Sequence, residues 1–330
     1  MKKIINDPKN VVGESLQGLV LANPSLMYIP ELEVVARKEK SGNVGVVSGG
    51  GSGHEPAHAG YVGQGMLDAA VAGNVFSSPS PDRILEGIRQ ANSGRGVLLV
   101  IKNYSGDIMN FEMAEQIARM EGIEVDHVIV RDDVAVEDST YSTGRRGIAG
   151  TIYVHKIAGA MAQTGVSLSE VKRVAEKAIE NIRSMGMAFS ACTLPEVGRP
   201  SFKLDEEEIE IGMGIHGEPG VKKTKIRPAK ELAESLFSYI QKDFLSLEGE
   251  VSVLVNGLGA TPLMELYILN KEIHMILEEN HIQVVHNLVG NYMTALDMAG
   301  ASVTILKLDK ELKELLLAPC NTTALQVKGE

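Results

Sequence analysis

Two histidines in a glycine-rich segment are the first candidates for chemistry in this sequence. Residues 46–60 read VVSGGGSGHEPAHAG, in which His54 and His58 match the zinc-protease motif H-E-x-x-H. The motif binds zinc only when both histidines lie on one face of a helix. Pro56 is tolerated in the first turn of a helix and costs about 3 kcal/mol in its interior. We therefore expect His54 to precede a helix that contains His58, so that the two rings do not share a face, and we predict no metal site.

Other motifs that would explain this segment also fail on spacing. A Walker phosphate loop needs Gly-Lys followed by Ser or Thr, and the chain has no Gly-Lys pair. The dinucleotide motif G-x-G-x-x-G and the nucleophile motif G-x-S-x-G would both need glycine in place of His54. What remains is a loop at the end of a buried strand, whose backbone N–H groups can approach a ligand closely. A tight turn with a surface histidine is the alternative interpretation.

Two further loops carry isolated reactive side chains. The segment KNYSGD follows the apolar run at 97–101 and offers the ammonium group of Lys102 and the carboxylate of Asp107. Lys102 could form a Schiff base and Asp107 could cap a helix, and for each residue alone a structural role is favoured. The segment GMGIHGEPG, residues 212–220, places His216 among glycines. Because small neighbours let a ligand approach the ring, we predict that His216 is functional.

Alternating apolar runs and helical patterns indicate an α/β fold. Strands, with helices between them as in βαβ units, are expected at residues 43–48, 97–101 and 126–130. Later strands and helices follow in a more mixed order, so we place a domain boundary near residue 185. We predict a first α/β domain, residues 1–185, with a largely parallel sheet flanked by helices, and a smaller mixed α/β domain, residues 186–330. The tail after Pro319 is expected to fray.

The composition argues against several classes of protein. The formal net charge of -11 is unsuited to a nucleic-acid backbone, and 4% aromatic residues with no Trp leave few side chains for stacking bases. Cys192 and Cys320 are the only cysteines and form no C-x-x-C pair, which fits a reducing compartment. No apolar run reaches the roughly 18 residues of a membrane span. We therefore expect a cytoplasmic protein that binds neither nucleic acid nor membrane.

Six segments together resemble the K subunit of dihydroxyacetone kinase, in the same order and through nearly the whole chain. They are GGGSGHEPAHAGYVGQGMLDAAVAG, VFSSPSPDRI, IKNYSGDIMNFEMA, VEDSTYSTGRRGIAG, IGMGIHGEPG and NGLGATPLMELY. The resemblance implies that dihydroxyacetone is held covalently, as a hemiaminal on the residue that matches His216. It also implies that His54 and Asp107 are the acid/base residues. The remaining substrate contacts would come from the side chain of Lys102 and from the backbone of residues Gly51, Ser52 and Gly53.

The implied roles have a chemical logic. Only a ketone or an aldehyde can form the adduct, so a covalent site can refuse glycerol, which is similar in size but has no carbonyl group. Asp107 would accept the proton of the hydroxyl that attacks phosphorus. His54 would hydrogen-bond the substrate and move protons while the adduct on His216 forms.

The resemblance also implies a partner. Phosphoryl transfer needs a nucleotide and Mg²⁺, and the chain has neither a phosphate loop nor a run of aspartates suited to the metal. We therefore expect no cofactor on this chain, and ATP or ADP with Mg²⁺ on a separate nucleotide-binding L subunit. In many bacteria of this family a phosphotransferase-system protein recharges that subunit. Family members of this kind form homodimers, and we expect the same here.

Two other functions compete with the kinase subunit. Some bacteria carry a relative of the K subunit that binds dihydroxyacetone and co-activates a transcription regulator without transferring phosphate. The presence of both His54 and Asp107 favours the kinase subunit, because a sensor has less use for a general base. A Schiff-base aldolase that uses Lys102 is the third interpretation, and borohydride would then trap a label on that lysine.

Overall fold

The chain folds into two compact units that are not contiguous in sequence. The computed structural model describes residues 2–137 and 144–329, so residues 138–143 of the segment VEDSTYSTGRRGIAG lie outside the described residues. The first unit consists of Met1–Val130, Thr151–Glu180 and Glu311–Glu330, and the second of Arg131–Gly150 and Asn181–Lys310. The boundary predicted near residue 185 lies close to one of the crossings between units, at 180/181. The crossings at 130/131, 150/151 and 310/311 were not predicted.

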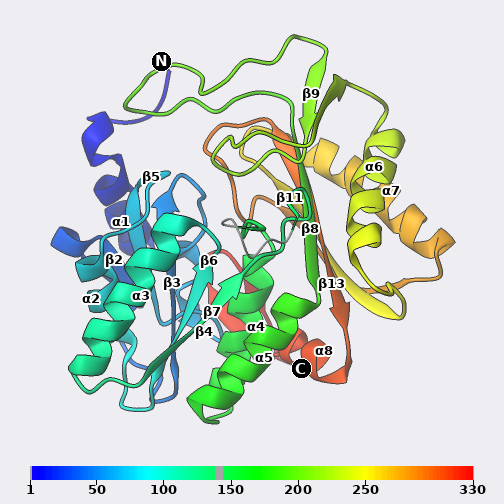
Figure 1. Ribbon diagram of the computed structural model, residues 1–330. Helices are drawn as coiled ribbons and strands as arrows, with labels where there is room; N and C mark the ends of the chain where they lie inside the picture. The colour runs from blue at the N-terminus through cyan, green and yellow to red at the C-terminus, as the bar shows by residue number, and fades with distance from the viewer. Residues whose placement is uncertain (1, 138–143, 330) are drawn as a thin grey trace. The chain divides into compact units, whose positions relative to one another are not determined.

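A six-stranded sheet forms the centre of the first unit, with the strand order β1-β2-β5-β3-β6-β7 (Figure 1). The strands are β1 (Leu26–Ile29), β2 (Val34–Arg37), β3 (Gly45–Ser52), β5 (Ala69–Val75), β6 (Val97–Lys102) and β7 (Val125–Val130). The pairs β3/β5, β3/β6 and β6/β7 are parallel, whereas β1/β2 and β2/β5 are antiparallel. The prediction of a largely parallel first sheet is therefore confirmed.

Helices cover this sheet and bury its apolar strands. Helices α2 (Pro81–Ala91) and α3 (Ser105–Met120) lie side by side against it (Figure 1), and their residues Ile84, Ile88 and Phe111 share one core with Val47 and Leu99 of the strands. The other helices of the unit are α1 (Val11–Ala22), α4 (Thr151–Gln163), α5 (Leu168–Glu180) and α8 (Lys310–Leu317), and the short 3-10 helices are η1 (Pro8–Asn10), η2 (Pro30–Leu32) and η3 (Ala59–Tyr61). Helices α4 and α5 pack against β3, β6 and β7, as expected for crossover helices on a parallel sheet.

The glycine-rich segment differs from its prediction in two ways. Strand β3 does not end at residue 48 but continues through the glycines to Ser52, and all of its residues are buried. The helix expected to contain His58 is absent. Residues 55–58 form turns, and only the short 3-10 helix η3 follows them. Pro56 has no N–H for a helical hydrogen bond, and the Ala57 N–H instead bonds to the carbonyl oxygen of His54 at 3.1 Å.

The chain's tail is ordered, which corrects the expectation that it frays. Strand β14 (Cys320–Thr322) pairs with β15 (Gln326–Val327) and with β4 (Gly63–Gln64), so the tail completes a small sheet in the first unit. Leu325 and Cys320 are buried there. Backbone pairing with a strand more than 250 residues earlier cannot be inferred from local sequence.

The second unit contains a mixed six-stranded sheet with the order β10-β9-β8-β13-β11-β12. Its strands are β8 (Ile182–Ala188), β9 (Glu208–Ile211), β10 (Lys222–Lys225), β11 (Glu250–Gly257), β12 (Gln283–Gly290) and β13 (Gly300–Leu308). Only β11/β12 is parallel among these pairs. Helices α6 (Ala229–Asp243) and α7 (Leu263–Glu279) share an apolar core with the sheet. The predicted α/β class and the mixed order are confirmed. Among the described residues, no helix is both long and apolar enough to cross a membrane.

Candidate functional site

The glycines of β3 allow a close approach between the backbone and its neighbours. A Cβ atom on Gly50 would lie 2.3 Å from the Nζ atom of Lys102, and one on Gly51 would lie 2.6 Å from the backbone nitrogen of Ser77. Both separations are shorter than real Cβ contacts. The glycines are therefore needed because a charged side chain and a backbone loop occupy the places where side chains would be.

Lys102 and Asp107 form a buried ion pair where β6 leads into α3. Lys102 is the last residue of β6 and Asp107 lies in the first turn of α3, where the positive end of the helix dipole favours a carboxylate. The Lys102 Nζ atom lies 3.4 Å from Asp107 Oδ2 and donates at 3.4 Å to the carbonyl oxygen of Gly49. The side chains are only 1% and 4% exposed. The structure thus brings together two residues that the sequence placed five positions apart.

Ser78 is a contact of Asp107 that the sequence did not reveal. Its hydroxyl donates to Asp107 Oδ1 at 2.5 Å, while Lys102 faces the other carboxylate oxygen. Ser78 lies in the segment VFSSPSPDRI, and nothing in that local pattern says which serine will point at Asp107. The two donors hold the carboxylate in one orientation.

His54, Ser52 and Gly53 lie at the end of β3. The His54 ring is fully buried and stacks on the Phe76 ring, with a centroid separation of 5.1 Å and an interplanar angle of 18°. The Ser52 hydroxyl donates to the carbonyl oxygen of Gly73 at 2.7 Å, and the Gly53 N–H donates to Glu55 Oε1 at 3.1 Å. These contacts fix the loop that carries His54.

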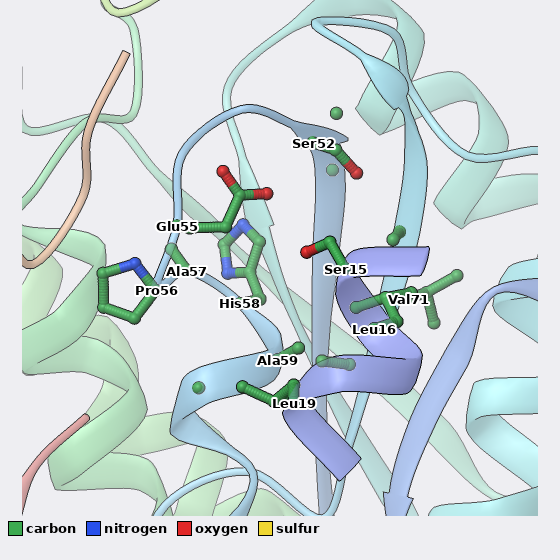
Figure 2. Close-up of a pocket in the computed structure, with 15 residues that line it drawn as sticks. Ser15, Leu16, Leu19, Ser52, Glu55, Pro56, Ala57, His58, Ala59 and Val71 are labelled. Carbon is green, nitrogen blue, oxygen red and sulfur yellow. The ribbon is translucent and has the colours of Figure 1, made fainter. Parts of the chain in front are cut away.

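A cavity of about 350 Å³ adjoins the glycine segment in the first unit. Figure 2 shows Glu55 and His58 on one side of it and Ser15 and Leu16, from α1, on the other. Gly50, Gly51 and Ser52 belong to its lining, whereas His54, Lys102 and Asp107 do not.

His216 lies in the second unit, in the loop that follows β9, and it forms a pair with Glu218. Its Nδ1 atom is 2.8 Å from Glu218 Oε1, and its backbone N–H donates to Glu218 Oε2 at 3.0 Å. Burial raises the pKa of Glu218, but the hydrogen bond from His216 and the charge of that ring outweigh it and hold the pKa at about 2. Since the carboxylate is ionised, Nδ1–H must be the donor. A neutral His216 ring therefore carries its lone pair on Nε2.

Glu218 was missed in the sequence, although it lies within the segment that singled out His216. Its role depends on the turn at Gly214–Gly217, in which Gly217 has a φ of +83° and the Gly217 N–H bonds to the Gly214 carbonyl oxygen at 3.1 Å. A Cβ atom on Gly214 would lie 2.0 Å from Glu218 Oε2. The glycines around His216 therefore make room for its carboxylate partner.

One group of side chains has the spacing of metal ligands, but its members already form ion pairs with each other and with neighbouring basic side chains. Among the described residues, Glu115, Asp126 and His127 bring ligand atoms within 4.8 Å of one another. Glu115 pairs with Arg119 at 2.5 Å and with His127 at 2.7 Å, and Asp126 pairs with Lys172 at 2.7 Å. The hydrogen bond that the His127 ring donates to the Glu115 carboxylate raises the pKa of His127, against the effect of burial. These contacts assign the group to structural ion pairs.

We expect Gly50→Ala to reduce activity strongly while the protein still folds. The added methyl group would displace the Lys102 ammonium group, which we expect to contact the substrate, and a misplacement of about 1 Å in an active site can cost roughly a hundredfold in rate. The cost in unfolding free energy should be about 1–3 kcal/mol. Gly18→Ala is the matched control, because a Cβ atom there meets nothing within 4 Å. Equal turnover in the two variants would show that the position of Lys102 does not matter.

Comparisons with known proteins cover almost the whole chain. Residues 17–324 match the Dak1 domain family. A relative from Listeria innocua, a dihydroxyacetone-binding subunit of a PTS-dependent dihydroxyacetone kinase, is 53% identical over 98% of this chain and 100% of its own. A solved dihydroxyacetone kinase operon co-activator matches with a TM-score of 0.91 and 38% identity, over 96% of this chain and 99% of that chain. The dihydroxyacetone kinase of C. freundii in complex with AMP-PNP and Mg²⁺ matches with a TM-score of 0.89 and 36% identity, over 99% of this chain and 61% of that chain.

Proposed function

The chain belongs to the Dak1 domain family, and on that premise we propose that it is the dihydroxyacetone-binding subunit of a dihydroxyacetone kinase. The observation that carries this function is the 53% identity, over the full length of the relative, with a subunit of that kind. The buried pair of Lys102 and Asp107 adds the groups that phosphoryl transfer to a hydroxyl requires. The reaction gives dihydroxyacetone phosphate.

Capture of the substrate begins at His216. The Nε2 lone pair attacks the carbonyl carbon, a C–N bond forms, and the electron pair of the C=O bond moves to the oxygen, which takes up a proton from a general acid. The His216 ring becomes cationic, and the Glu218 carboxylate, 2.8 Å from Nδ1, stabilises that charge. Glycerol cannot react in this way because it has no carbonyl carbon.

Transfer of phosphate depends on Asp107. Its carboxylate accepts the proton of the substrate hydroxyl as the oxygen attacks phosphorus. Lys102 and Ser78 hold the carboxylate from two sides, so its orientation is fixed before the substrate binds. The Lys102 ammonium group and the backbone of Gly51, Ser52 and Gly53 complete the contacts to the substrate.

A separate L subunit supplies the phosphate in this proposal. The chain matches 61% of the C. freundii kinase, a structure that contains AMP-PNP and Mg²⁺. We assign ATP or ADP with Mg²⁺ to a partner that corresponds to the rest of that longer chain. We also propose that the pair acts in the cytoplasm, since it depends on a nucleotide or on a phosphotransferase protein for its phosphate.

We also propose that two copies of this chain form a homodimer. Apolar side chains on α7 are exposed within the second unit and form one patch for a second copy to cover. They are Leu263, Met264, Tyr267 and Ile268, with exposures of 49%, 75%, 54% and 46%.

A second function is favoured by one observation, the TM-score of 0.91 with a co-activator of a dihydroxyacetone kinase operon. Such a protein would capture dihydroxyacetone on His216 and then bind a DNA-binding regulator. The higher identity with the kinase subunit, 53% against 38%, favours the kinase.

Turnover by the mixed subunits tests the function. The chain, a cognate L subunit and Mg-ATP together should form dihydroxyacetone phosphate, and each protein alone should form none. Substrate capture without product in the mixture, together with binding to a transcription regulator, would establish the co-activator instead. Borohydride should leave Lys102 unlabelled, and a label there would establish the Schiff-base aldolase.

Replacement of Glu218 should weaken the adduct. In Glu218→Gln the amide oxygen can still accept the Nδ1–H bond, but the cationic ring loses its counter-ion, so we expect dihydroxyacetone to bind roughly tenfold more weakly. Binding titration of the variant and of Glu248→Gln, an exposed control in the same unit, would measure this. Unchanged affinity in Glu218→Gln would contradict the role of the carboxylate.

The same pair predicts a pH dependence of stability. The pKa of Glu218 lies at about 2 in the folded chain and at its ordinary value of 4.5 in the unfolded chain. The pair therefore stabilises the fold fully above pH 4.5 and loses this effect as the pH falls toward 2. The unfolding free energy of the wild type should therefore fall more steeply over that range than that of Glu218→Gln.

A further inference from the structure

His58 is a buried histidine for which the function above has no use. Its side chain lies beside β3 in the first unit, and the residue is only 6% exposed. Its Nε2 atom has no hydrogen-bond partner among the described residues. An unsatisfied polar atom at this depth is costly, so a role for Nε2 is to be expected.

The contacts of Ser48 fix the tautomer of the His58 ring. The Ser48 hydroxyl has one hydrogen, and it donates this to the carbonyl oxygen of Val100 at 2.7 Å. The 3.3 Å contact between Ser48 Oγ and His58 Nδ1 must then have Nδ1–H as its donor. In a neutral ring this leaves the lone pair on Nε2.

The surroundings keep the ring neutral. Burial lowers the pKa of His58 well below its ordinary value, and the charges of Lys102, His155 and His54 lower it further. The His155 ring lies at a centroid separation of 5.2 Å, is fully buried, and has a pKa lowered to about 3 by burial and by Lys102. Asp107 is the carboxylate that pairs with Lys102.

The Nε2 atom lies close to the Lys102–Asp107 pair. All three side chains surround the place that a Cβ atom on Gly50 would occupy. That place is 3.6 Å from His58 Nε2, 2.3 Å from Lys102 Nζ and 3.4 Å from Asp107 Oδ2. The lysine ammonium group has three hydrogens, and its acceptors on Gly49 and Asp107 are both at 3.4 Å, which is long for a charged hydrogen bond. The buried ammonium group therefore has the capacity for a third acceptor.

We propose that His58 is a positioning residue, which directs its Nε2 lone pair at the Lys102 ammonium group and keeps that group beside Asp107. No direct hydrogen bond joins the two groups, so the lone pair acts on the ammonium group through space or through one bridging water molecule. The proposal rests on the proposed function only in taking Lys102 and Asp107 as the groups that act on the substrate.

Nitrogen NMR of the full chain tests the tautomer without any need for turnover. In protein labelled with ¹⁵N-histidine, the His58 signals are assigned by their absence from His58→Gln. We expect a protonated Nδ1 and a non-protonated Nε2 across the range in which an ordinary imidazole titrates. In Lys102→Met the Nε2 signal should shift because the nearby ammonium charge is lost, while the signals of distant histidines such as His281 stay in place. A protonated Nε2, or an Nε2 signal unchanged in Lys102→Met, would overturn the proposal.

Turnover by His58 variants mixed with the L subunit distinguishes a positioning role of His58 from a role in packing alone. In His58→Gln the amide oxygen can reach the place of Nε2, so activity should remain within roughly threefold of the wild type. In His58→Asn the amide reaches only the place of Nδ1, and kcat should fall roughly tenfold to a hundredfold. His281→Asn, at an exposed histidine, is the matched control. Equal kcat in the Gln and Asn variants would contradict the inference. If the wild-type mixture forms no product, the proposed function fails, and the NMR result still decides the role of His58.

Discussion

His216→Ala should abolish covalent capture of dihydroxyacetone and reduce turnover by the mixed subunits by a factor of roughly 10⁴ or more. The alanine has no lone pair to attack the carbonyl carbon, and the remaining contacts would hold the ketone only by hydrogen bonds. Selection against glycerol should collapse as well, because the two molecules then differ little in size and in hydroxyl groups. Competition between dihydroxyacetone and glycerol, measured by titration, would record both effects.

The variant should fold, since the His216 side chain is 20% exposed and belongs to a surface loop of the second unit. A loss in unfolding free energy of about 1–3 kcal/mol is expected, because the Glu218 carboxylate loses its hydrogen-bond partner on the ring. His281→Ala provides the control for loss of a histidine from the same unit. Wild-type affinity and selectivity in His216→Ala would mean that dihydroxyacetone binds without the covalent bond.

Asp107→Asn should still capture dihydroxyacetone but lose turnover by roughly 10²- to 10⁴-fold, as expected when a general base is removed. The asparagine can accept the hydrogen bond from Ser78 but cannot take the proton of the attacking hydroxyl. Binding titration combined with product formation separates the two steps. A variant that is still active would show that another group is the base.

The Asp107 test needs a stability control, because Asp107→Asn leaves the Lys102 ammonium group buried without its counter-ion. Breaking a buried pair on one side typically costs about 3–5 kcal/mol. Lys102→Met combined with Asp107→Asn removes both charges and should recover part of that stability. If the double variant folds well and remains inactive, loss of the charged groups rather than loss of the fold explains the result, and the single variant Lys102→Met shows how much of the loss belongs to the lysine.

Much of the fold could be predicted because local patterns decide its parallel half. The apolar runs that became β6 and β7 and the helical pattern between them define a βαβ unit, so the strand-to-helix junction that holds Lys102 and Asp107 followed from sequence. The passage of 131–150 into the second unit, and the return of the tail to pair with β4, depend on contacts between distant segments. Periodicity over a dozen residues carries no information about such contacts.

The candidate site shows the same division between local and distant information. His216 stood out because glycines surround it, whereas its partner Glu218 became evident only from the geometry of the turn. Ser78 reaches Asp107 from 29 residues away, and both His58 and Lys102 approach Gly50 from segments far apart in the sequence. Glu218, Ser78 and His58 thus lie near residues that the sequence did identify, but local sequence did not reveal that proximity. The prediction that His54 and His58 would not share a helical face assumed a helix that contains His58, but residues 54–58 form no helix.

The most direct test of the account is an NMR measurement of the bond between substrate and protein. Dihydroxyacetone labelled with ¹³C at its carbonyl carbon would be added to chain labelled with ¹⁵N-histidine. A tetrahedral carbon signal with a one-bond coupling to the Nε2 nitrogen of His216, absent from His216→Ala, is the predicted result. A bound substrate whose carbonyl carbon shows no coupling to any histidine nitrogen, in a mixture that still forms dihydroxyacetone phosphate, would contradict covalent capture.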